Sequence, residues 1–172
     1  MGSDPLRHLL DAAVDGDDVA FGRLVRATQA AVWGVCRNLG SAGEEEDLVQ
    51  ETYLRAMGAA HGYRGDAPVL VWLLTIARRT CADHVRRRTR QRDLLQRLAR
   101  ERHVASAPGS STEALLAELD ADRRAAFALT QLVGLSYEEA AQVLDCPIGT
   151  VRSRVARARQ QLLELVRRAD AR

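Results

Sequence analysis

A chain of 172 residues, 47% hydrophobic but only 4% aromatic, can form one ordinary domain or two small ones with an aliphatic core. Three widely spaced cysteines argue against a disulfide framework or a zinc site, and no long apolar run or signal pattern is present, which predicts a cytoplasmic protein without membrane insertion. The net charge of +2 is unevenly distributed: residues 1–51 carry 4 Arg and 10 acids, whereas residues 52–92 carry 9 Arg and 2 acids. This asymmetry suggests two faces for two partners, one of them an anion.

The N-terminal part is predicted to form four helices, because apolar residues recur there at helical spacing. The first is expected to open at Pro5, whose fixed φ suits a first helical turn. The fourth begins near Pro68, with Asp66 as a candidate cap. The second, third and fourth helices are expected at about residues 18–38, 44–57 and 68–88 or beyond.

The predicted third helix has an apolar inner face and an acidic outer face. Leu48, Thr52 and Ala56 belong to the inner face at helical spacing. The outer face with its exposed leucine is typical of a protein-docking surface, although a simply solvated face gives the same pattern. The outward residues are Asp47, Gln50, Glu51 and Leu54.

The predicted fourth helix carries an aromatic residue on its basic side. On a helical wheel Leu70, Leu73, Leu74, Ala77, Cys81 and Val85 form the buried face, and Trp72, Thr75, Arg79, Asp83, Arg86 and Arg90 lie opposite. An aromatic ring among arginines can stack on an unpaired base while the arginines follow the backbone. The polar loop 61–67, just before this helix, could capture an extruded base. The alternative is that Trp72 packs against a neighbouring loop, such as that of Tyr63.

The C-terminal part is predicted to form four shorter helices after a linker rich in small residues. These helices are expected at about 112–119, 121–132, 136–144 and 147–167. No segment shows the alternation of a strand. The expected fold is therefore all-α, with two small helical domains at residues 1–92 and 113–172 and a flexible linker at 93–112.

Two of these helices form a predicted helix-turn-helix near the C-terminus. Ser136 and Glu139 have the spacing of a capping box, and Pro147 can open the next helix after a tight turn. In that helix Val151, Val155, Ala158 and Leu162 are expected to face inward, and its polar side carries Thr150, Arg152, Ser153, Arg154 and Arg157. Such a surface fits the major groove of DNA, whereas isolated arginines would more often be solvated.

Three motifs occur in a fixed order between residues 47 and 154. They comprise residues 47–56, the segment from 63 to 78 with 83–88, and residues 134–141 with 146–154. These motifs resemble regions 2.2, 2.3 with 2.4, and 4.2 of the extracytoplasmic-function (ECF) class of bacterial RNA polymerase sigma factors. One helix-turn-helix alone would be unspecific, but three motifs at the proper spacing are not.

The resemblance implies a role for each surface. The outward face of Asp47, Gln50, Glu51 and Leu54 would dock on the β′ clamp helices of core RNA polymerase, and the C-terminal domain would contact the β flap. The melted minus-ten strand would be held by Tyr63, Arg64, Asp66, Trp72, Arg79 and Arg86. The minus-thirty-five element would be read by Thr150, Arg152, Ser153, Arg154 and Arg157. An anti-sigma protein is a further candidate partner, and no cofactor is expected.

Two other classes of protein are alternatives to a sigma factor. A stand-alone helix-turn-helix regulator would use its N-terminal bundle as a sensor or dimerisation domain and would not need Trp72 among arginines. An enzyme is disfavoured because the four histidines are scattered and the chain has neither a phosphate-binding loop nor a nucleophile elbow.

Overall fold

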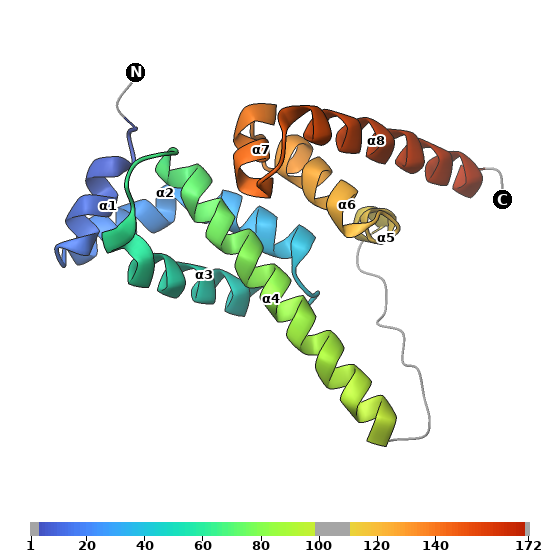
Figure 1. Ribbon diagram of the computed structural model, residues 1–172, viewed down its shortest axis with the longest axis horizontal. Helices are drawn as coiled ribbons and strands as arrows, with labels where there is room; N and C mark the ends of the chain where they lie inside the picture. The colour runs from blue at the N-terminus through green and yellow to red at the C-terminus, as the bar shows by residue number, and fades with distance from the viewer. Residues whose placement is uncertain (1–3, 99–110, 171–172) are drawn as a thin grey trace.

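The structure, a computed structural model, describes residues 4–98 and 111–170, and every regular element in these ranges is helical (Figure 1). The all-α prediction is therefore confirmed. The elements are α1 (Arg7–Val14), α2 (Asp18–Leu39), α3 (Glu45–Ala59), the 3₁₀ turn η1 (Ala60–Gly62), α4 (Val69–Leu98), α5 (Ser111–Ala117), α6 (Ala121–Phe127), the π-helical turn η2 (Ala128–Leu132), α7 (Tyr137–Leu144) and α8 (Ile148–Asp170).

Helices α1 to α4 form the N-terminal bundle, and local signals fix where its helices begin. The Asp17 carboxylate caps α2, because it accepts the amides of Val19 at 2.8 Å and Ala20 at 3.0 Å. Three acids occupy the first turn of α3, where the helix dipole favours them. Inside the bundle the buried Thr28 hydroxyl lies 2.8 Å from the Tyr53 hydroxyl, so these polar groups satisfy each other.

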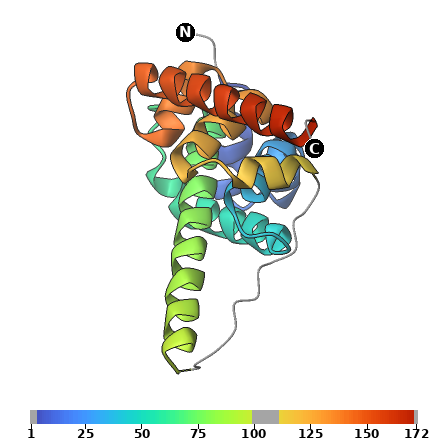
Figure 2. The same cartoon turned by 90° about the vertical axis from the view of Figure 1, so that its right-hand side faces the viewer.

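Helix α4 is the longest element, and its C-terminal half projects away from the bundle (Figure 2). Its first half carries the predicted core face, since Leu73, Leu74, Ala77 and Cys81 are all buried. Val85 was expected on the same face but is 37% exposed, and this prediction is wrong. Val85 lies on the side of α4 that faces the C-terminal helices, but it lines a cavity with Leu39 and Leu144 instead of packing in the core.

The linker expected at residues 93–112 is helical at both ends. Residues 93–98 continue α4, and residues 111 and 112 already belong to α5. The part between them lies outside the described residues. The domain boundaries at 92 and 113 remain a prediction, and the described helices show only that α4 continues beyond residue 92.

The C-terminal helices contain the predicted helix-turn-helix. The Ser136 hydroxyl accepts the Glu139 amide at 3.1 Å and the Glu139 carboxylate accepts the Ser136 amide at 2.8 Å, which confirms the capping box. Asp145 adopts the left-handed conformation, with φ 52°, where α7 ends. In α8 the predicted inner face is confirmed: Val151, Val155 and Ala158 are buried and Leu162 is half-buried.

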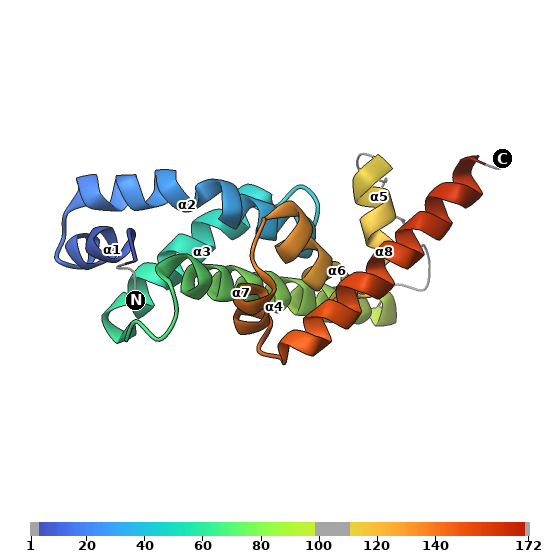
Figure 3. The ribbon, with the colours of Figure 1, turned by 90° about the horizontal axis from the view of Figure 1, so that it is seen from above.

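The two groups of helices pack against each other through a shared apolar core. Figure 3 shows α7 lying across α4, and α6 and η2 contact α2. Val71 and Leu74 of α4 belong to the same buried cluster as Ala140 and Val143 of α7. The two groups approach closely at Gly34, because a Cβ there would lie 3.1 Å from Val133 Cγ2, which is tighter than an ordinary van der Waals contact. The flexible linker predicted from the sequence would permit many arrangements of the two domains, whereas the structure has one packed arrangement.

Within the described residues, no helix has both the length and the apolar character needed to cross a membrane.

Candidate nucleic-acid interface

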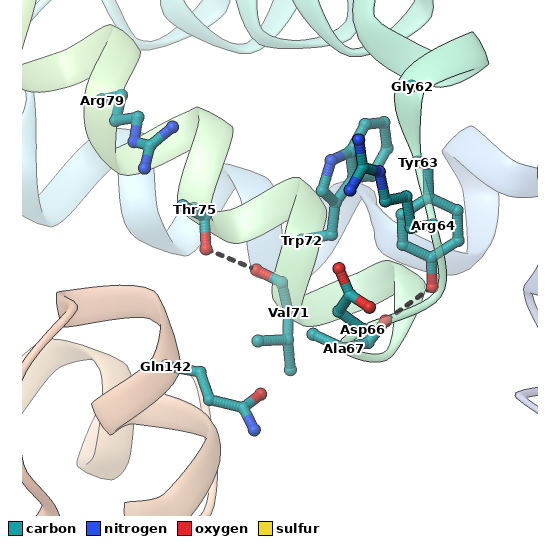
Figure 4. A pocket seen from close by; sticks show the side chains of 10 residues that line it. All are labelled: Gly62, Tyr63, Arg64, Asp66, Ala67, Val71, Trp72, Thr75, Arg79 and Gln142. Atoms are coloured by element: carbon teal, nitrogen blue, oxygen red, sulfur yellow. Dashed lines mark hydrogen bonds between the residues drawn. The ribbon is translucent and has the colours of Figure 1, made fainter.

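A cavity of about 410 Å³ lies beside the start of α4, within the size range of small-ligand sites (Figure 4). One side is formed by the loop after η1, and another by successive turns of α4. Five of the six residues predicted for the minus-ten element line it together. Its lining comprises Gly62, Tyr63, Arg64, Asp66, Ala67, Val71, Trp72, Thr75, Arg79 and Gln142.

The two aromatic residues of this cavity pack on each other. The ring centroids of Tyr63 and Trp72 are 5.1 Å apart with the ring planes inclined at 46°, and Trp72 is half-buried. The Tyr63 hydroxyl donates to the Ala67 carbonyl oxygen at 2.6 Å, which closes the loop on itself. Burial raises the pKa of Tyr63, and the nearby Asp4 carboxylate adds to the effect. The alternative in which Trp72 packs against the loop of Tyr63 is therefore confirmed, and Trp72 also lines the cavity.

The charged residues divide between two places. Arg64, Asp66 and Arg79 are exposed at the cavity, where their side chains meet solvent. Arg86 lies apart from them: it lines a second cavity of about 390 Å³ between the two groups of helices, and its guanidinium is 3.7 Å from Asp83. The structure thus brings five of the predicted minus-ten residues together and leaves Arg86 outside.

One residue of this cavity comes from the other domain and was missed at the level of sequence. Gln142 of α7 lines the cavity opposite the loop, pointing in from the C-terminal helices (Figure 4). It belongs to the helix-turn-helix motif, and its side chain is exposed. No sequence signal could have revealed this position, because it depends on how α7 packs on α4.

The polar face of α8 is largely open. Arg152, Ser153 and Arg157 are exposed, and Thr150 is half-buried. Arg154 differs, because its guanidinium bonds to the Asp122 carboxylate of α6 and lies 3.7 Å from the Cys146 sulfur. Three of the five predicted residues are therefore exposed for contact, whereas Arg154 is held by its neighbours.

The predicted docking face of α3 lies on the surface of the bundle. Asp47 and Gln50 are exposed, and Leu54 is 64% exposed. Glu51 is half-buried, and Arg55 lies 2.7 Å from it and 3.1 Å from Asp83 of α4. The structure brings the four residues together on one helix, and the Arg55 bridge connects that helix to α4.

Comparisons with known proteins show the family of this chain. Residues 24–91 match the family described as sigma-70 region 2, and residues 111–162 match sigma-70 region 4. The ECF RNA polymerase sigma factor SigC of Mycobacterium tuberculosis is 41% identical over 160 residues, covering 88% of this chain and 86% of the relative. The chain belongs to the ECF RNA polymerase sigma factors.

Other relatives of this sigma factor support the same assignment. The ECF RNA polymerase sigma-E factor of Escherichia coli is 33% identical over 172 residues, covering 90% of each chain. The structure of CnrH in complex with the cytosolic domain of CnrY has a TM-score of 0.73 at 31% identity, covering 93% of this chain and 96% of that one. The sigma factor RpoE of Bartonella quintana, in complex with the anti-sigma factor NepR, has a TM-score of 0.71 at 31% identity, covering 86% and 96%.

The matched families divide this sigma factor as the surfaces do. The region 2 match contains the predicted docking face and every residue lining the aromatic cavity except Gln142, and the region 4 match contains Gln142 and the helix-turn-helix with the polar face of α8. Helix α1 precedes the region 2 match, although it contacts η1 beside the cavity.

Proposed function

We propose that this sigma factor binds core RNA polymerase, recognises the minus-thirty-five and minus-ten elements of promoters, and promotes strand opening for transcription initiation. The observation that carries the proposal is the cavity in which Tyr63 and Trp72 lie beside exposed arginines. A double helix offers no free base for such a cavity. A strand whose bases have been unstacked does, and aromatic stacking with arginine contacts is the usual way to hold one.

In this proposal the cavity holds the non-template strand of the minus-ten element. A base leaving the stack enters the cavity beside the packed rings of Tyr63 and Trp72, and Arg64 and Arg79 contact its phosphates. Each stacked base is typically worth about 1–3 kcal/mol, which offsets part of the cost of unpairing. Arg79 stands in a motif where the resembling family often has Asn, so this chain contributes an additional positive charge there.

The polar face of α8 reads the minus-thirty-five element in the major groove. Arg157 and Arg152 are exposed, and a guanidinium can bond bidentately to guanine. Ser153 and Thr150 reach bases or phosphates. Arg154 contacts DNA only if it exchanges Asp122 for a phosphate, which makes it a positioning residue for α8 in the free protein.

The outer face of α3 docks on the β′ clamp helices of the polymerase. An exposed leucine between acids suits a partner surface that is apolar at its centre and basic at its edge. The C-terminal domain is proposed to contact the β flap. Two relatives of known structure are complexed with another protein, NepR being an anti-sigma factor, and an anti-sigma protein is a candidate partner here too.

This function has no catalytic step of its own, in keeping with a family of initiation factors. The chemistry belongs to the polymerase, and the proposed place of action is the cytoplasm, where the polymerase and chromosome are found. A stand-alone regulator is the weaker alternative, because the region 2 match spans residues 24–91 and leaves little of the N-terminal bundle for a separate sensor.

Reconstituted transcription tests the proposal. Purified core RNA polymerase from the source organism is incubated with a pool of genomic promoters, with and without this protein. New, discrete start sites that depend on the protein are expected, and aligned upstream sequences then give both promoter elements. If no starts appear while the protein still shifts duplex DNA, the stand-alone regulator replaces the sigma-factor proposal.

A further inference from the structure

The segment before the region 2 match contacts both the loop that borders the aromatic cavity and the start of the helix that follows this loop. Residues 4–14 include Asp4, which reaches the start of α4, and Arg7, which reaches the loop itself. Neither residue lines the cavity. Arg7 nevertheless contacts the Tyr63 ring, and Asp4 bonds to the first turn of α4, which carries Trp72.

Asp4 caps α4 from a distance of 65 residues along the chain. Its Oδ2 accepts the Val69 amide at 2.6 Å, and its Oδ1 accepts the Leu6 amide at 3.0 Å. This bond replaces the cap expected from Asp66, which is exposed at the cavity. Because a capping carboxylate at a helix start is favoured by the dipole, Asp4 fixes the first turn of α4, from which Trp72 projects.

Arg7 holds the loop from its other side. Its guanidinium carbon lies 4.9 Å from the centroid of the Tyr63 ring, which is a cation–π contact. Its Nε donates to both Asp11 carboxylate oxygens, at 2.9 and 3.0 Å, which raises the pKa of Arg7 and fixes the orientation of the side chain. A Cβ added to Gly65 would lie 2.9 Å from Arg7, so the guanidinium fits closely against the loop backbone.

A small buried apolar cluster also packs against the aromatic residues of the cavity. Leu10 of α1 and Val69 of α4 are 1% and 0% exposed in a buried cluster of their own, separate from the main core. Tyr63 and Trp72 pack against this cluster. Helix α1 therefore supports the cavity from below while Asp4 and Arg7 fix its edges.

We propose that Asp4 and Arg7 are positioning residues for strand capture, which hold the loop of Tyr63–Ala67 in the shape that accepts an unstacked base. This inference rests on the proposed function. A loop that is already ordered binds without the entropic cost of being ordered by its ligand. A small displacement of positioned groups is enough to slow a step that depends on their geometry.

The test uses holoenzyme assembled from core polymerase and the full chain, on a promoter found by reconstituted transcription. 2-Aminopurine replaces single adenines of the non-template minus-ten element, so that its fluorescence rises when the base leaves the stack. Asp4→Ala and Arg7→Ala are expected to slow this rise about tenfold, while affinity for the closed duplex changes less than about twofold. Thermal unfolding of each variant reports whether the bundle remains folded.

Two further variants separate positioning from general damage. Arg23→Ala removes an exposed arginine of α2 away from the loop and is expected to match the wild type. Asp4→Asn keeps an oxygen that can accept the Val69 amide and is expected to restore most of the signal. Failure of this rescue would overturn the hydrogen-bond role of Asp4.

Different experimental outcomes would overturn the proposed function and the positioning role of Asp4 and Arg7. If the wild-type holoenzyme produces no start sites, the proposed function is lost and the positioning role with it. If the wild type opens the promoter and both alanine variants give the same fluorescence rise at the same rate, strand capture stands and the positioning role is overturned.

Discussion

The Arg154 guanidinium on α8 bonds to the Asp122 carboxylate on α6, so one arginine of the proposed reading helix is already partnered within the protein. Its side chain is 26% exposed. Arg157 on the same helix is exposed, and its side chain forms no hydrogen bond or ion pair with any residue that the structure describes. The two arginines have the same charge and lie on one helix, yet they are expected to respond differently to substitution.

Arg157→Ala is expected to weaken promoter binding by about 1–3 kcal/mol and to relax the preference at one position of the minus-thirty-five element. Arg154→Ala is expected to weaken binding to all sequences similarly. Binding to a set of single-base variants of the site measures both effects. An unchanged preference in the Arg157 variant would remove that residue from the base-reading set.

Trp72→Ala is expected to leave duplex promoter binding near the wild-type value and to impair opening by about tenfold, because about 1–3 kcal/mol of stacking is lost. Permanganate reactivity of thymines at the start site measures opening. Trp33, which is 39% exposed on α2, supplies the control Trp33→Ala. Normal reactivity in the Trp72 variant would contradict the role of the cavity.

The charge-reversed pair Asp47→Arg and Glu51→Arg is expected to abolish co-purification with core polymerase, since like charges across an interface cost several kcal/mol. The control pair is Asp15→Arg with Asp93→Arg, two exposed acids outside the proposed contact surfaces that carry the same change of net charge. Retained binding of the first pair would refute the docking face on α3.

Gly34→Leu is expected to separate the two packed groups of helices, because a side chain there meets Val133. Within a helix the substitution itself is favourable, so α2 is expected to remain folded. Gly58→Leu on α3 is the control, because a Cβ there meets nothing within 4 Å. Small-angle scattering is expected to give a larger radius of gyration for the first variant only, and equal radii would show that the contact does not hold the domains together.

Ser136→Ala is expected to lower the free energy of unfolding of the C-terminal helices by about 0.5–2 kcal/mol, because the Glu139 amide in the first turn of α7 loses the hydroxyl that accepts it. Denaturant unfolding followed by circular dichroism measures the change. Ser153→Ala removes an exposed hydroxyl that bonds only within its own helix, and its smaller effect provides the comparison. Equal losses in the two variants would rule out a special role for the cap.

Much of the fold could be predicted from local patterns. The capping box at Ser136 and Glu139 is a property of four consecutive residues, and the inner face of α8 follows from helical spacing alone. The proposed docking and reading faces were located in the same way, since a wheel distinguishes polar from apolar sides. These features depend on residues within a few turns of one another.

Other features were decided by contacts between distant segments. Asp4 rather than Asp66 caps α4, Gln142 enters the cavity from α7, and Val85 lines a second cavity instead of packing in the core. Arg154 shows the same limit, since its partner Asp122 lies 32 residues earlier in the chain. Periodicity along one helix determines which side is apolar, whereas only the packed tertiary structure determines what meets each side and which charged groups neutralise one another.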